Sequence, residues 1–273
     1  MSELAEKVQQ DLVAAIDNDD LVLPTLPEVA LQIRKAAEDP EISVSDLSKV
    51  IGRDTALSAR LIKVVNSPLL RAAQEVTDLH TAITRLGINY SSNLAIGLVM
   101  EQIFNARSEV VEQKMREVWR SSLEIAGVSY ALCRRYTQLK PDQAALGGLV
   151  HQIGVLPILT YAEDHNELLS DAVSLTHVIE QIHPLLGEKL LRVWEFPERL
   201  VQLPLLYQDF SRDSTRIDYV DVVQVANLYC RKGTDHPFAR IDPFSVPAFR
   251  KLGIDPENKQ FCADLEESRS MFY

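Results

Sequence analysis

The order of apolar and polar positions is helical along most of the chain. In DTALSARLIKVVNSP, Leu57, Leu61, Val64 and Val65 recur at the three- and four-residue spacing of one helix face. No stretch of similar strength alternates apolar and polar residues with the two-residue period of a strand. We therefore predict an all-α fold that contains many helices.

Capping and breaking residues place the helix ends. Thr25 stands three residues before Glu28, the spacing of a capping box, which predicts a helix that ends before Pro40. Gly87 is a suitable residue to end another helix. Further helices are predicted over 109–138, 141–154, 157–162, 172–182, 184–195, 197–206 and 217–232, with a last one in the charged tail PENKQFCADLEESRS.

Composition shifts only once, in FNARSEVVEQKMREVW, where polar residues become dense between two apolar blocks. We place a soft boundary there. The predicted parts are an N-terminal helical bundle over 1–107 and a helical core with a C-terminal extension over 108–273.

Charge and cysteine content exclude several classes of protein. The formal net charge of -11 gives an average surface field that repels nucleic acid and anionic lipid. Cys133, Cys230 and Cys262 follow neither a disulfide framework nor a zinc-finger spacing, which is typical of a reducing compartment. The N-terminal residues lack the pattern of a signal peptide, and we find no apolar run of about 18 residues. We expect a cytoplasmic protein that does not insert into a membrane.

Two histidines stand in unusual places. His151 continues an apolar helix face in GGLVHQIGVLPIL, where Gly147 and Gly148 would let another backbone approach closely. It can be a hydrogen-bonded core residue or a metal ligand. His183 precedes Pro184, a predicted helix start, so it can be a junction residue or face a cleft.

The order of several motifs resembles the HDOD family, a branch of the HD phosphohydrolase superfamily, over about residues 23–232. The core motifs that carry the resemblance are VWRSSLEIAGVSYALCRR, AALGGLVHQIGVLPIL, IEQIHPLLGEKLLRVWEFPERL and YVDVVQVANLYCRK. In the first part LPTLPEVA, DTALSARLIKVVNSP and AITRLGINY are similar to the family pattern. The resemblance implies a helical bundle packed on an HD-like helical core.

The resemblance also implies where the metal ligands of active HD enzymes would lie. Those enzymes use a His on the first core helix, an adjacent His-Asp pair, sometimes further histidines, and a late Asp. At these places this chain has, in order, Ser121, His151, Gln152, His183, Tyr207, Gln208 and Asn227, which we call the remnant site. Of these ligands only two histidines remain, His151 and His183. Neutral amides, Gln152 and Asn227, stand in place of both carboxylates.

This loss of charge predicts that the remnant site does not hydrolyse phosphate esters. Two imidazoles make a weak site for a hard divalent cation, and without the cation no water is activated. We expect no cofactor, and a divalent metal only if His151 and His183 retain one. Asp209, Asp218 and Asp221 could supply carboxylates from shifted places, but Asp221 and Asn227 lie on different faces of one helix.

The resemblance favours a non-catalytic regulatory module in bacterial signalling, which binds a signalling protein or a small ligand such as a nucleotide. The first alternative is a metal-dependent phosphohydrolase with substituted ligands. The second is a DNA-binding regulator, because residues 45–66 have the length of a helix-turn-helix with its turn at 52–54. Arg53, Arg60 and Lys63 would face phosphates, and Thr55 and Ser58 base edges. The net negative charge argues against DNA as a partner.

Overall fold

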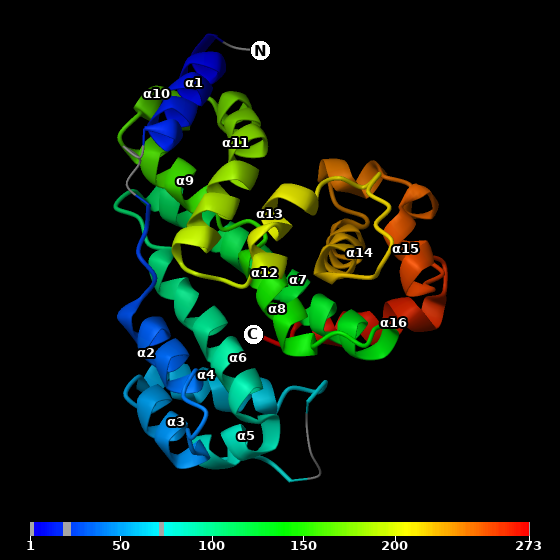
Figure 1. Cartoon of the computed structure of the whole chain (residues 1–273). Coiled ribbons are helices and arrows are strands. Elements are labelled where there is room, and N and C mark those ends of the chain that lie inside the picture. Colours follow the sequence, from blue (N-terminus) through cyan, green and yellow to red (C-terminus); the bar gives the residue numbers. More distant parts are fainter. Residues whose placement is uncertain (1–2, 19–22, 71–73, 273) are drawn as a thin grey trace.

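The computed structural model describes residues 3–18, 23–70 and 74–272, which form helices and connecting loops without a strand (Figure 1). This confirms the all-α prediction. The first part contains α1 (Glu3–Asp17), α2 (Glu28–Ala37), α3 (Val44–Ile51), α4 (Thr55–Val65), α5 (Leu79–Leu86), α6 (Ile88–Val99) and the 3-10 helix η1 (Met100–Ile103). The second part begins with α7 (Glu109–Tyr136), α8 (Pro141–Val150), α9 (Val155–Glu163), α10 (Asn166–Ser170) and α11 (Ala172–Val193). It continues with α12 (Glu198–Val201), α13 (Leu203–Leu206), α14 (Tyr219–Arg231), η2 (Pro237–Arg240), η3 (Pro243–Ser245), α15 (Pro247–Leu252) and α16 (Lys259–Arg269).

Helices α2 to α6 form the front bundle. The predicted turn between α3 and α4 is present, and the Asp54 carboxylate accepts a hydrogen bond from the backbone N–H of Leu57, which caps α4. Gly87 separates α5 from α6 with a φ of 85°, which few other residues tolerate. The predicted Thr25 cap is wrong: Pro27 precedes the first residue of α2, and its ring supplies no side-chain cap.

Helix α1 packs against α11, in the second part of the chain (Figure 1). Helix α6 packs against both α2 and α8, so it connects the front bundle to the core. The sequence pattern alone assigns residues 1–107 to one part, and that boundary stays a prediction. In the structure the first helix contributes to the core.

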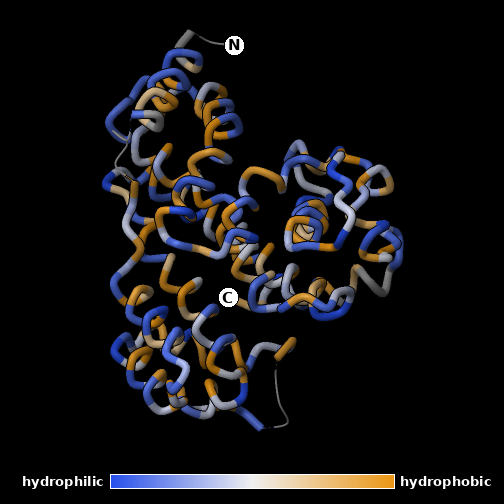
Figure 2. The backbone as a smooth tube through the Cα atoms, viewed as in Figure 1, coloured by the Kyte–Doolittle hydropathy of each residue, from blue (hydrophilic) through white to orange (hydrophobic). Residues whose placement is uncertain are grey.

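The core surrounds α7, against which α8, α14 and α16 pack. Apolar residues of these helices are buried in the core. Figure 2 shows how hydrophobic and hydrophilic residues follow one another along the backbone. The segment Pro141–Glu163 is the one place, among the described residues, where length and apolar composition would suit a membrane span. Its most apolar window is 83% buried inside the protein, which explains the low polarity by core packing.

Helix α11 is longer than the sequence pattern predicts. Two helices were expected on either side of Pro184, but α11 runs through it without a break. The prediction failed because Pro inside a helix removes one hydrogen bond without always ending the helix, when tertiary packing holds both halves in place. His183 is therefore a mid-helix residue that is 2% exposed, and the junction reading of it is wrong.

Candidate functional site

Two glycines position the turn that carries His151. A side chain at Gly148 would come within 2.6 Å of the Ala126 Cα, so the glycine lets α8 lie directly on the backbone of α7. A side chain at Gly154 would overlap the backbone of α11 at His183 and Gly187. The expected close backbone approach thus occurs at Gly148, and the turn between α8 and α9 rests on the helix that carries the second histidine.

His151 is fully buried, with 0% of its surface exposed. Its Nδ1 lies 2.7 Å from the carbonyl oxygen of Gly148, so Nδ1 carries the proton and donates it. Its Nε2 then has a free lone pair, and no hydrogen-bond partner reaches it among the described residues. Burial lowers the pKa of His151 to about 3, an effect that the nearby Arg231 charge strengthens. The imidazole is neutral at physiological pH.

His183 belongs to a network of polar side chains in which His183 and Tyr207 are buried and Gln152 and Gln208 are partly buried. Its Nε2 lies 2.6 Å from the amide nitrogen of Gln208 and 3.1 Å from the hydroxyl of Tyr207. The Gln208 amide nitrogen can only donate, so Nε2 of His183 accepts and the ring proton is on Nδ1. Gln152 and Gln208 both donate to the Tyr207 hydroxyl, at 3.4 and 2.8 Å. Burial lowers the pKa of His183 to about 4, so this imidazole is neutral too.

Tyr207 fills the space between the two histidines. It is fully buried, and its ring centroid lies 4.9 Å from that of His151 and 5.8 Å from that of His183. Burial raises its pKa to about 12, so the phenol keeps its proton and can donate it. The two histidines are therefore brought together through an aromatic ring, which both imidazoles contact.

Ser121 and Asn227 complete the remnant site. Arg231 on α14, which the family resemblance does not single out, contacts Ser121. Arg231 follows Asn227 by four residues on α14, so both lie on one helix face. Its Nη2 donates to the Ser121 Oγ at 2.5 Å. Both polar side-chain atoms of Asn227 are buried without a hydrogen-bond partner in the described part of the chain. In the sequence, the four-residue spacing between Asn227 and Arg231 already indicates that both lie on one helix face.

The residues of the remnant site do not fit a divalent cation. Its donors are two imidazoles, two carboxamides that replace carboxylates, and a serine hydroxyl that already accepts from a guanidinium. Within residues 3–18, 23–70 and 74–272, no three His, Cys, Asp or Glu side chains converge as a metal site would require. The positive charge of Arg231, close to His151 and Tyr207, further opposes a second cation.

The three aspartates that could have supplied carboxylates are used elsewhere. Asp221 is fully buried and forms an ion pair with Lys251, its Oδ2 lying 2.5 Å from Nζ. Asp218 caps α14 and pairs with Arg212. Asp209 accepts hydrogen bonds from the backbone and hydroxyl of Ser211. None of these partners belongs to the remnant site, so the shifted-carboxylate alternative finds no support in this geometry.

The residues considered for DNA contact are partly engaged within the protein. Arg60 forms an ion pair with Glu101, and Arg53 donates to the side chain of Gln32 at 3.1 Å. The Ser58 hydroxyl donates to the backbone carbonyl of Asp54, the residue that precedes α4. DNA binding stays a prediction. The two other residues considered for contact are exposed: Thr55 and Lys63.

Comparison with known proteins extends this description. A solved structure from Shewanella amazonensis SB2B, provisionally described as a metal-dependent phosphohydrolase, is 27% identical and superposes with a TM-score of 0.88 over 98% of this chain and 99% of that one. An HDOD domain protein of unknown function from Geobacter sulfurreducens, 20% identical, has a TM-score of 0.70 over 99% and 97%. The latter likeness shows the fold alone.

Two further proteins are similar to this chain, and the solved one, at 22% identity, shows the fold alone. A structure from Marinobacter aquaeolei VT8, provisionally described as a signal transduction protein, is 22% identical with a TM-score of 0.66, covering 98% of this chain and 66% of that one. A curated protein of Treponema pallidum (strain Nichols), named only as uncharacterized, is 25% identical over 262 residues, which are 90% of this chain. The chain spans about half of that relative, 49% of its length.

The family assignment rests on a match to the HDOD domain over residues 23–209. This range includes the front bundle, both histidines and the network around Tyr207. Since it covers more than half of the 273 residues and agrees with the helical fold, the chain belongs to the HDOD family.

Proposed function

We propose that this protein is a regulatory module in bacterial signalling, which acts by binding and does not hydrolyse phosphate esters at the remnant site. The carrying observation is the contact of the Arg231 guanidinium with Ser121, at the place where active HD enzymes have their first metal ligand. A fixed cation of the protein thus stands where the family's chemistry needs an exchangeable one. A cytoplasmic location and a signalling protein as partner belong to the same proposal.

Burial at the remnant site supports a binding role that is located elsewhere. His151, Tyr207 and Asn227 have no exposed surface, and His183 has 2%. A partner protein cannot reach these side chains without opening the core. Ser121, Gln152 and Gln208 are only partly buried, so any accessible part of the remnant site is limited to them. We therefore place the surfaces that recognise a partner or ligand outside it.

The proposal is tested on protein purified without chelator. Metal content is measured by mass spectrometry, and hydrolysis of phosphodiesters and nucleotides is measured with added Mn²⁺, Mg²⁺ or Zn²⁺. We expect substoichiometric metal and no turnover above background. Stoichiometric metal, together with turnover that His151→Ala abolishes, would contradict the proposal and favour the phosphohydrolase alternative.

A further inference from the structure

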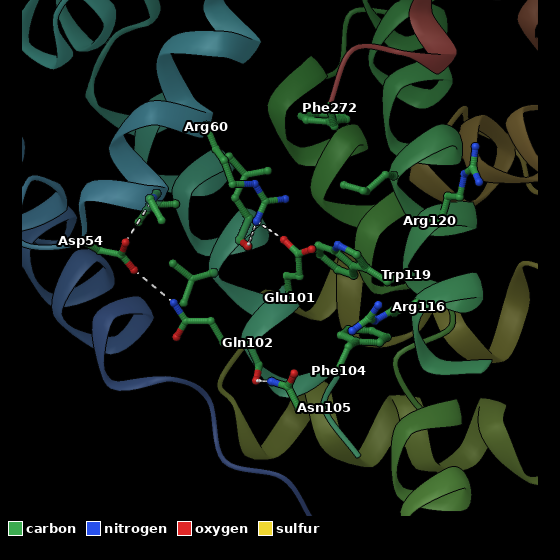
Figure 3. A pocket seen from close by; sticks show the side chains of 15 residues that line it. Asp54, Arg60, Glu101, Gln102, Phe104, Asn105, Arg116, Trp119, Arg120 and Phe272 are labelled. Carbon is green, nitrogen blue, oxygen red and sulfur yellow. Dashed lines mark hydrogen bonds and ion pairs between the residues drawn. The ribbon is translucent and has the colours of Figure 1, made fainter. Parts of the chain in front are cut away.

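A pocket of about 920 Å³ lies where the front bundle meets the core (Figure 3). One wall comes from α4, α6 and η1, and the facing wall from α7, with Phe272 of the C-terminal segment between them. Its volume lies within the range of about 300–1,000 Å³ typical of small-molecule sites. We call it the interface pocket. None of the residues of the remnant site lines it.

Three arginines line the interface pocket. Arg60 lies on α4, and Arg116 and Arg120 lie one turn apart on α7. The carboxylates that line the pocket are Asp54 and Glu101. Arg116 also forms an ion pair with Glu112, one turn earlier on α7, and Arg60 forms one with Glu101. A guanidinium presents a planar fork that matches phosphate oxygens.

The Arg60 guanidinium is held in place yet remains accessible. Its Nη1 donates to the Leu98 carbonyl at 3.1 Å and also forms an ion pair with Glu101. The side chains are 30% and 50% exposed, so the Glu101 carboxylate can leave for water at small cost. A ligand phosphate can replace that carboxylate while the carbonyl of Leu98 keeps the arginine positioned.

Trp119 provides a second, independent indication of a ligand. It lines the interface pocket from α7, is 4% exposed, and its indole N–H has no acceptor among the described residues. A buried indole N–H usually has a hydrogen-bond partner. Its ring lies 4.8 Å from that of Phe104, centroid to centroid, so the wall behind the arginines is aromatic. Figure 3 shows Trp119 facing the Arg60–Glu101 pair.

We infer that the interface pocket binds a nucleoside phosphate, whose phosphate group takes the place of Glu101 on Arg60 and whose base lies against the aromatic wall. The phosphate matches the arginines, and the base matches the apolar surface and the unpaired indole donor. This inference rests on the proposed binding role and names its ligand class. A ligand here contacts the front bundle and α7 together.

The test measures binding by calorimetry at low salt in EDTA, with ATP and GTP as probes, and with tripolyphosphate and adenosine as charge-only and base-only controls. We expect at least one nucleotide to bind about tenfold more tightly than either control. Arg60→Gln should weaken binding about tenfold or more, since a charge-assisted hydrogen bond is lost. Glu101→Gln should strengthen it. Lys63→Gln, an exposed change on α4 outside the pocket, should have no effect.

Trp119→Phe guards against a variant that fails to fold, because it keeps an aromatic ring and removes only the N–H. We expect weaker nucleotide binding with an unchanged circular dichroism spectrum, and loss of the nucleotide-induced quenching of tryptophan fluorescence. The other tryptophan, Trp194, donates to the Pro24 carbonyl at 3.0 Å, outside the pocket lining.

Three results would overturn the inference: no nucleotide binding up to about 1 mM, a low-affinity limit; tripolyphosphate binding as tightly as the nucleotides; or the same affinity in Arg60→Gln and Trp119→Phe as in the wild type. The proposed absence of HD hydrolysis is decided separately, by metal content and turnover. Failure of one proposal is therefore distinguishable from failure of the other.

Discussion

Arg231 donates a hydrogen bond to Ser121 over 2.5 Å, joining α14 to α7 across the remnant site. The contact joins the helix that carries the late ligand position, Asn227, to the helix that carries the first one, Ser121. Burial lowers the pKa of the Arg231 guanidinium. An arginine side chain nevertheless keeps its positive charge in a protein. The positively charged side chain of Arg231 thus connects α14 to α7.

Combining Gln152→Asp and Asn227→Asp with Arg231→Met should create affinity for a divalent metal. The changes restore two carboxylates and remove the opposing charge, while His151 remains as a ligand with a free Nε2. Mn²⁺ binding is measured by calorimetry and the bound metal by mass spectrometry. The wild type and an exposed control, Gln202→Asp, should bind none. A folded triple variant without metal would show that these side chains do not converge.

The neutral histidines predict a loss of stability in mild acid. Burial lowers the pKa of His183 to about 4, whereas in the unfolded chain it is about 6.5. Above pH 6.5 both states are neutral, and the histidine makes no contribution that depends on pH. As the pH falls below 6.5, only the unfolded state takes up the proton, so folding stability decreases until the folded pKa is reached.

For a single buried histidine, this loss amounts to about 2 kcal/mol between pH 6.5 and pH 5. Urea unfolding of the wild type and of His183→Gln at both pH values measures it. The variant should lose less stability than the wild type on acidification. His80→Gln, at an exposed position, should behave as the wild type does. Equal losses in all three proteins would contradict a buried neutral His183.

Gly154→Ala should destabilise the fold by about 1–3 kcal/mol or more, the range for overpacking a core. The added methyl group would overlap the α11 backbone at His183 and Gly187. Gly233→Ala is the matched control, because Gly233 has a φ of 76° and no atom within 4 Å of the added group. Its cost should be only the backbone term of about 1–2 kcal/mol. Thermal unfolding of both variants separates overlap from backbone strain, and a smaller effect at Gly154 would refute the contact.

Asp221→Asn should cost about 3–5 kcal/mol, because it removes a buried carboxylate that pairs with Lys251, whose side chain is 10% exposed, and with Arg212. Asp213→Asn breaks an exposed pair with Arg250, whose side chains are 53% and 74% exposed, and should cost less than about 1 kcal/mol. Denaturant unfolding gives both values. Metal content should not respond to either change. A loss of bound metal in Asp221→Asn would revive the shifted-carboxylate alternative.

Much of the fold was accessible from the sequence, because helix periodicity and capping residues are local signals. The turn before α4 and the break at Gly87 followed from such signals. Pro184 misled, since its local effect is opposed by packing on both halves of α11, which periodicity does not report. The contact of α1 with α11 is equally non-local.

The candidate site, too, could be predicted only in part from the sequence. The family pattern pointed to His151, His183 and Tyr207, and the structure places both histidine rings against the ring of Tyr207. It did not identify Arg231, whose importance depends on a contact with Ser121, 110 positions away. The interface pocket was missed entirely, since its residues come from α4, η1 and α7 and share no sequence motif.

Gly154 also bears on how this family can change. In an enzyme whose metal ligands come from several helices, the ion holds those helices together. Each ligand then stabilises the fold as well as binding the metal. Here the bare backbone of Gly154 on α11, and of Gly148 on α7, makes those connections directly. We therefore expect substitutions at the ligand positions to destabilise the fold less than substitutions of the small residues at these helix crossings.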